Sequence, residues 1–121
     1  MRLGLDLVLV ERVAAMVSAS PDGGEQLFAE PELAVARAME GRRREQFLAG
    51  RFAVKEAFCK AVGGPAGIAP RDLACVRQTA GELRLELGDT ALAAMAREGC
   101  VEAAVRISHD AGLATAAVLA W

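Results

Sequence analysis

The segment GRFAVKEAFCKAVG, from Gly50 to Gly63, mixes four charged residues with apolar ones. At about 100° of rotation per residue, one sector of a helix collects its apolar side chains together with that of Phe47. Glu56 and Lys60 are four residues apart and share another side, as do Arg51 and Lys55. Periodicity alone predicts an amphipathic helix with an ordinary Glu–Lys pair on its solvated side. A helix whose polar groups form a reactive site is the alternative.

The residues before this segment predict one strand and two shorter helices. LGLDLVLV, residues 3–10, has the apolar run of a buried strand, with Asp6 as its one polar interruption. A helix follows from Val10 and ends before the loop SASPDGGE. The next helix begins at Pro31, which suits a first helical turn. The long helix then runs from about Arg42 to Val62.

The second half of the chain predicts a hairpin, a short helix and two further strands. After the loop GGPAGIAP, these elements occupy residues 72–78, 82–88, 89–99, 101–108 and 112–121. Asp89 suits the cap of the short helix and Gly99 its end, and HDAG forms the last turn. The order predicts an α+β fold, an antiparallel sheet with the long helix packed on it, in a single domain of residues 1–121.

Composition limits the classes of partner. The 121 residues are 54% hydrophobic and 25% charged, with a net charge of −2, which argues against binding nucleic acid through bulk basic charge. GRRRE, at Gly41–Glu45, is the densest basic stretch and is typical of a solvated helix turn. No signal-peptide layout and no long apolar run are present, so we expect a cytoplasmic protein without membrane contact. The cysteines form no CxxC pair and predict buried, reduced thiols.

Polar residues that interrupt apolar elements are the candidates for chemistry. Asp6 lies mid-strand, where a carboxylate is costly unless it is paired or binds a cation. Ser108 ends a predicted strand and His109 follows it, and both offer phosphate ligands, although a lone histidine at a strand end is more often a surface or capping residue. Asp6 and Glu56 with nearby cations suit a magnesium–phosphate site, because Mg²⁺ takes one or two protein carboxylates and leaves its other positions to water and phosphate. Their spacing does not show that they meet.

Three segments in order, GLDLVLVERV, FLAGRFAVKEAFCKAVG and VRISHDAGLATAAV, resemble the holo-acyl-carrier-protein synthase family over nearly the whole chain. These are short 4′-phosphopantetheinyl transferases. The resemblance implies the transfer of 4′-phosphopantetheine from coenzyme A to a serine of an acidic apo acyl carrier protein, with Mg²⁺ required and adenosine 3′,5′-bisphosphate released. It also implies the fold of that family and a homotrimer with active sites at the subunit interfaces.

The resemblance assigns roles residue by residue. Asp6 and Glu56 match the metal-binding carboxylates, and Lys60 matches a lysine near the transferring phosphate; these three form the expected catalytic group. The remaining matches concern substrates: Arg51 and His109 near the coenzyme A phosphates, Arg42 and Arg43 around the 3′-phosphate, and Arg12 at the surface that meets the carrier protein. Either Glu56 or a metal-associated water accepts the serine proton.

The chain departs from the family between its first two helices. Only Arg12 remains of the usual arginines there, and Glu11 stands beside it. The docking surface is therefore expected to be weaker or tuned differently, and the sequence leaves open whether the carrier is a fatty-acid, a polyketide or another specialised one. A non-catalytic module that binds coenzyme A or a carrier protein is the alternative function.

Overall fold

The computed structural model describes all 121 residues and has the element order that the sequence predicts. The elements are β1 (Arg2–Leu9), α1 (Val10–Ala19), α2 (Glu30–Arg37), α3 (Gly41–Ala61), the 3₁₀ turn η1 (Pro70–Asp72), β2 (Leu73–Arg77), β3 (Leu83–Leu87), α4 (Asp89–Arg97), β4 (Ala103–Asp110) and β5 (Leu113–Ala120). Mixed helices and antiparallel strands confirm the α+β class. None of the helices is both long enough and apolar enough to cross a membrane.

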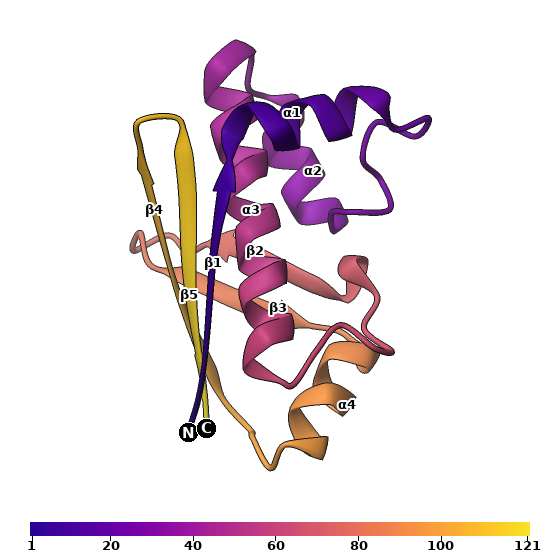
Figure 1. Cartoon of the computed structure of the whole chain (residues 1–121), viewed down its shortest axis with the longest axis vertical. Helices are drawn as coiled ribbons and strands as arrows, with labels where there is room; N and C mark the ends of the chain where they lie inside the picture. Colours follow the sequence, from indigo (N-terminus) through magenta and orange to yellow (C-terminus); the bar gives the residue numbers. More distant parts are fainter.

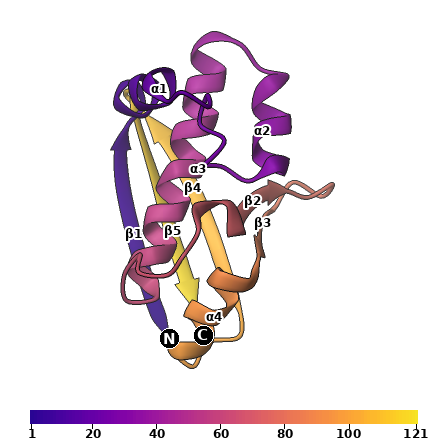
Figure 2. The ribbon, with the colours of Figure 1, turned by 90° about the vertical axis from the view of Figure 1, so that its right-hand side faces the viewer.

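The strands form two sheets, where the sequence led us to expect one. β1, β5 and β4 pair antiparallel in the order β1-β5-β4, and β2 pairs with β3 in a separate hairpin. Figures 1 and 2 show α3 between the three-stranded sheet and the hairpin, with both chain termini at the same end. β3 lies close to β4, but no strand pairing joins the hairpin to the three-stranded sheet.

The predicted apolar sector of α3 packs into the core. Val54, Ala57, Phe58 and Ala61 are buried against the three-stranded sheet and belong to one hydrophobic cluster. A second cluster joins the first half of α3 to α1 and α2, around Phe28 and Leu48. Because α3 contacts other elements on nearly every side after its first turn, ten of its 21 residues are buried.

Arg51 and Lys55 are buried, so the prediction of a simple amphipathic helix is wrong on that side of α3. Lys55 Nζ lies 2.6 Å from Glu32 Oε1 and donates to the carbonyl oxygens of Pro70 and Leu73. Burial lowers the pKa of Lys55, and the Glu32 carboxylate acts against that shift. The sequence analysis missed this ion pair.

The Glu32 carboxylate also satisfies two buried backbone donors. Its Oε1 accepts from the Ala29 N–H at the start of α2, and its Oε2 accepts from the Cys75 N–H in β2. Glu32 and Lys55 together therefore connect α2, α3 and β2 through charge-assisted hydrogen bonds.

Three local predictions need correction. Asp89 does not cap α4; Asp72 accepts instead from the Thr90 N–H at 2.9 Å and from its hydroxyl at 2.7 Å. The turn HDAG is reduced to Ala111 and Gly112, both at positive φ, because β4 continues through Asp110. Cys59 is partly exposed, whereas the other two cysteines are buried as expected.

Replacing Lys55 by Met tests the buried ion pair. We expect the free energy of unfolding to fall by about 3–5 kcal/mol, because the substitution leaves the Glu32 carboxylate buried without its counter-charge. Urea denaturation measures the change. The matched control is Lys60→Met on the same helix, whose ammonium is exposed and screened by water, and it should cost far less. Equal costs at the two positions would contradict a stabilising role for the pair.

Candidate active site

Gly4 allows β1 to lie directly against α3. A Cβ at this position would overlap with the carbonyl oxygen of Ala57 and would lie 2.7 Å from the amide nitrogen of Ala61. Since side chains alternate along a strand, Asp6 projects from the same face as Gly4, toward α3. The spacing G-x-D therefore has a steric reason. The glycine lets the backbones of β1 and α3 come together, and the aspartate two residues later reaches α3 from the same face of the strand.

The Asp6 carboxylate meets Lys60 on α3. Asp6 Oδ1 lies 2.8 Å from Lys60 Nζ, and this hydrogen bond and the carboxylate charge raise the pKa of Lys60. The Asp6 side chain is only 12% exposed, whereas Lys60 remains 56% exposed. Lys60 thus pairs across to β1, and the ordinary pair with Glu56 that periodicity predicted is not formed.

The other Asp6 oxygen has no partner. Oδ2 is buried and makes no hydrogen bond, although a carboxylate oxygen in that position carries a large desolvation penalty. The Asp6 residue borders a cleft of about 420 Å³, called here the carboxylate cleft, whose lining includes Asp6, Arg12, Met16, Phe52 and Glu56. Two carboxylates from two elements and the predicted carrier-facing arginine therefore lie around one opening.

The carboxylate cleft has the donor set of a magnesium site. No group of three or more His, Cys, Asp or Glu side chains is arranged to hold a metal. Two carboxylates are nevertheless enough for Mg²⁺ when phosphates and water supply the other ligands. The Asp6 oxygen without a hydrogen-bond partner fits such an ion, because a bound cation would compensate the charge that no protein donor compensates.

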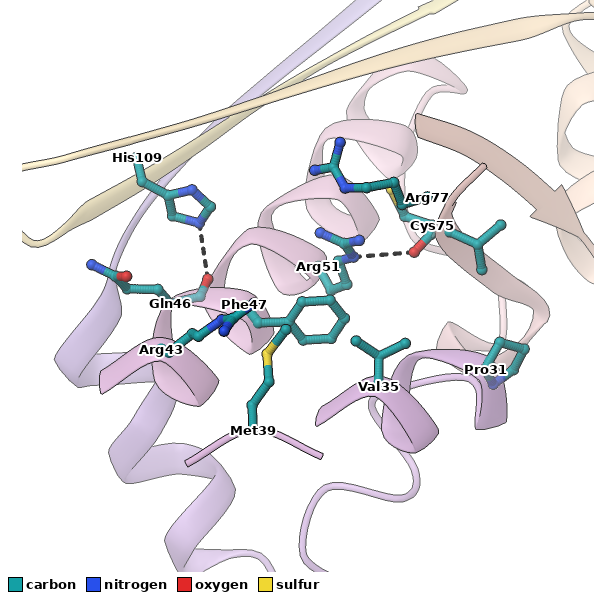
Figure 3. Close-up of a pocket in the computed structure, with 11 residues that line it drawn as sticks. Pro31, Val35, Met39, Arg43, Gln46, Phe47, Arg51, Cys75, Arg77 and His109 are labelled. Carbon is teal, nitrogen blue, oxygen red and sulfur yellow. Dashed lines mark hydrogen bonds between the residues drawn. The ribbon is translucent and has the colours of Figure 1, made fainter. Parts of the chain in front are cut away.

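Three of the four predicted phosphate-binding cations, Arg43, Arg51 and His109, line a second opening, called here the cation cleft (Figure 3). It has a volume of about 620 Å³ and carries the side chains of Arg43, Arg51, Arg77 and His109 beside an apolar wall. The Arg51 guanidinium lies 4.2 Å from the centre of the Phe47 ring, and its Nε donates to the Cys75 carbonyl at 3.1 Å. Burial lowers the pKa of Arg51. The cleft combines fixed positive charge with an aromatic surface.

Gly50 positions His109 at this cleft. A Cβ on Gly50 would lie 3.0 Å from His109 Nε2 and 3.2 Å from the Ile107 side chain. Its absence lets the end of β4 approach α3, where the His109 Nε2 lies 2.9 Å from the Gln46 carbonyl oxygen. The sequence analysis missed this role; a glycine inside a helix was the available signal.

Not all predicted residues meet. The two clefts share no lining residue, so within one chain Asp6 and Glu56 border a different opening from Arg43, Arg51 and His109. Arg42 is exposed on the first turn of α3, as expected of GRRRE, but does not line the cation cleft. Ser108 alternates with His109 along β4 and projects from the opposite face. Arg77, at the end of β2, was missed because nothing in its sequence surroundings distinguishes it.

Comparisons with known proteins agree with this fold. The profile of the 4′-phosphopantetheinyl transferase superfamily matches residues 2–116. The holo-[acyl-carrier-protein] synthase of Streptomyces coelicolor is 39% identical over 118 residues, which cover 98% of this chain and 94% of that protein. The chain therefore belongs to the 4′-phosphopantetheinyl transferase superfamily, as an enzyme of its holo-[acyl-carrier-protein] synthase group. The resemblance drawn from the sequence is confirmed.

Solved structures agree in fold. The ACPS–CoA complex of Chronobacterium ammoniagenes superposes with a TM-score of 0.85 at 30% identity, covering 98% of this chain and 95% of that one. The Bacillus anthracis holo-(acyl-carrier-protein) synthase in complex with CoA (3′,5′-ADP) gives a TM-score of 0.80 at 28% identity, covering 98% and 94%.

Replacing Gly4 or Gly50 by alanine should change the free energy of unfolding by very different amounts. We expect Gly4→Ala to lower the free energy of unfolding by about 3 kcal/mol or more, because its Cβ meets backbone atoms that cannot move aside. Gly50→Ala should change it by no more than about 1 kcal/mol, because helix propensity offsets a contact with side chains that can adjust. Urea denaturation of both variants checks this, and a mild effect at Gly4 would contradict the close approach.

Proposed function

We propose that this chain, as a single domain of residues 1–121, transfers 4′-phosphopantetheine from coenzyme A to a serine of an apo acyl carrier protein and releases adenosine 3′,5′-bisphosphate. The observation that carries the proposal is that Asp6, which has one buried carboxylate oxygen without a partner, lines the same cleft as Glu56. The relatives named holo-[acyl-carrier-protein] synthase and the related structures with coenzyme A support the same chemistry.

Asp6 and Glu56 hold the metal in this proposal. When bound, Mg²⁺ offsets the negative charge of the pyrophosphate and of the leaving phosphate. Lys60 has its exposed ammonium within 2.8 Å of Asp6, so it stands where it can stabilise charge on the phosphoryl oxygens of the same substrate. The carboxylate cleft has no serine, cysteine or threonine in its lining, which agrees with attack by a hydroxyl that the carrier protein supplies.

The cation cleft binds the nucleotide end of coenzyme A. Arg43, Arg51 and His109 provide positive charge and hydrogen-bond donors for phosphates, and the ring of Phe47 offers an aromatic surface beside them. Its volume of about 620 Å³ is in the usual range for a small-molecule site. Arg77 lines the same opening and joins this group.

The two ends of coenzyme A then meet different copies of the chain. The carboxylate and cation clefts have no residue in common, and one coenzyme A joins its pyrophosphate to its nucleotide covalently. The outer face of the three-stranded sheet offers a surface for assembly, since Leu3, Leu5 and Leu7 are 58–62% exposed there. We assign a homotrimer in which neighbouring copies place a carboxylate cleft against a cation cleft.

The acceptor approaches at α1. Arg12 lies on the wall of the carboxylate cleft, so a carrier protein docked there has its serine close to Asp6 and Glu56. A single arginine with Glu11 beside it favours a carrier of lower negative charge than the usual partner.

Removing either carboxylate tests the metal assignment. We expect Asp6→Ala and Glu56→Ala each to lower Mg²⁺-dependent transfer about 100-fold or more, because charge on the pyrophosphate is then left without compensation. The mass gain of an apo carrier protein incubated with coenzyme A measures transfer. Glu82→Ala, in the exposed β2–β3 turn, is the control and should keep full activity. Retained activity in either cleft variant, with a folded protein, would refute the assignment.

Mixing two inactive variants tests the shared site. Glu56→Ala disables the carboxylate cleft and a His109→Ala, Arg43→Ala double variant disables the cation cleft. If each site takes one cleft from each of two neighbours, equal mixtures refolded together should regain about a quarter of wild-type activity, since that fraction of interfaces pairs two intact clefts. Each variant refolded alone is the control. No recovery, with mixed oligomers shown by mass spectrometry, would contradict an active site built from two chains.

A further inference from the structure

Three charged residues are buried beside the cation cleft, and only Arg51 among them lines it. Glu32, Lys55 and Arg51 are 1%, 5% and 6% exposed, and no other polar or charged residue is buried as a whole. Lys55 Nζ lies 2.6 Å from Glu32 Oε1, so the one buried carboxylate compensates one of the two buried cations. Arg51 makes no ion pair. The cluster therefore keeps one positive charge without a partner, and the residue that carries it faces the cleft.

Two side chains hold the edge of β2 that β3 does not cover. In an antiparallel pair the N–H and the carbonyl of one residue point to the same side of the strand. The Cys75 N–H donates to Glu32 Oε2 at 3.0 Å, and the Cys75 carbonyl accepts from Arg51 Nε at 3.1 Å. Glu32 and Arg51 are therefore linked through one residue of β2, although no hydrogen bond joins them directly.

Glu32 connects three of the elements that form the cation cleft without lining the cleft itself. Its own helix, α2, contributes Pro31 and Val35 to the wall, whereas β2 contributes residues 75–77 and α3 contributes Arg51. The Glu32 carboxylate accepts from the first turn of α2, from the edge of β2 and from Lys55 on α3. A displacement of this carboxylate would change the distances between all three walls.

This arrangement leaves one end of Arg51 available to a ligand. Its Nε is used by the Cys75 carbonyl, as Figure 3 shows, and its guanidinium carbon lies 4.2 Å from the centre of the Phe47 ring. The two terminal nitrogens make no hydrogen bond with the protein and are not fully buried. A guanidinium fixed at Nε and stacked on a ring presents its terminal N–H groups in one direction, which suits a phosphate.

We propose that Glu32 is a positioning residue for the phosphates of coenzyme A. Its buried carboxylate fixes the edge of β2 at Cys75, and this edge directs the Arg51 guanidinium toward a phosphate in the cation cleft. The inference rests on the proposed function, because it takes the nucleotide end of coenzyme A as the ligand of that cleft. The bound phosphate then supplies the negative charge that the buried cluster lacks. Glu32 touches no ligand and acts through Arg51.

Binding of adenosine 3′,5′-bisphosphate, measured by calorimetry, tests the role of Glu32. The double variant Glu32→Gln, Lys55→Met removes both charges of the pair together, so no buried charge is left without its partner. The amide replaces one acceptor oxygen by a donor, so the N–H of either Ala29 or Cys75 loses its acceptor. We expect Kd to rise about tenfold in this variant, with the folded state verified by circular dichroism.

Adding Arg51→Ala shows whether the effect passes through Arg51. Alone, this substitution should raise Kd about tenfold or more, because a phosphate loses its buried cation. In the triple variant Kd should stay within about twofold of that of Arg51→Ala, since Glu32 then has no guanidinium to position. Losses that add up in the triple variant would contradict the proposed route.

A matched control separates positioning from stability. Met95→Ala removes a buried side chain of α4 from the core and should lower the free energy of unfolding while leaving Kd unchanged. Hydrogen exchange of the Arg51 Nε–H, followed by NMR without ligand, should be faster in Glu32→Gln, Lys55→Met than in the wild type and unchanged in Met95→Ala. If Glu32 only stabilised the fold, the double variant would behave like Met95→Ala in both measurements, and the inference would be overturned.

Glu32→Asp is the second variant and decides the question if the neutral pair does not fold. It keeps the charge that compensates Lys55 but shortens the side chain by one methylene, so the carboxylate no longer reaches both backbone donors. We expect Kd to rise about threefold or more, with faster exchange of the Arg51 Nε–H. An unchanged Kd in this folded variant would equally count against a positioning role.

Failure of the inference and failure of the proposed function give different results. Wild-type binding of adenosine 3′,5′-bisphosphate with an unchanged Kd in the Glu32 variants overturns the inference alone. Transfer to an apo carrier protein without any binding of this nucleotide does the same. Absence of both binding and transfer in the wild type refutes the proposed function, and the inference with it.

Discussion

The contact between the backbones of β1 and α3 at Gly4 is the constraint on which the arrangement of the site depends. Three alternate residues of β1 face the C-terminal half of α3: Arg2 donates to the Ala61 carbonyl, Gly4 meets Ala57, and Asp6 reaches Lys60. Only a residue without a Cβ permits the middle contact. Any side chain there would separate strand and helix, and the Asp6 carboxylate would no longer lie within hydrogen-bond distance of Lys60.

The charged residues of α3 show that equal spacing in the sequence does not determine whether a side chain is buried or exposed. Arg51 and Lys55 are separated by four residues, as are Glu56 and Lys60, yet the first two are buried and the others exposed. The difference arises from the segments that pack on each side. Glu32, from another helix, supplies the counter-charge for Lys55, and the Cys75 carbonyl accepts from Arg51. A charge can be buried only where such partners converge, and these partners are distant in the sequence.

Local patterns therefore predicted the elements and the carboxylates, but not the contacts between elements. The strand around Asp6, the three N-terminal helices and the hairpin follow from periodicity, glycines and prolines, all within a few residues of the segment concerned. Asp72 as the cap of α4 and Glu32 as the partner of Lys55 depend on chain segments brought together by folding. The resemblance to a family added candidate roles that spacing did not provide.

β1 supplies two features of the proposed active site: the Asp6 carboxylate on one face and the exposed leucines on the other. In β1 the odd-numbered residues Leu3, Leu5 and Leu7 cover the outer face of the sheet, whereas Gly4 and Asp6 face α3. A register slip of one residue would exchange the two sets, turning Asp6 away from Lys60 and placing leucines against the helix backbone. The exposed leucine face of the strand thus cannot change independently of its carboxylate. If neighbouring copies pack on the leucine face, the alternation that exposes it is the same one that directs Asp6 into the carboxylate cleft, so assembly and catalysis depend on a single register.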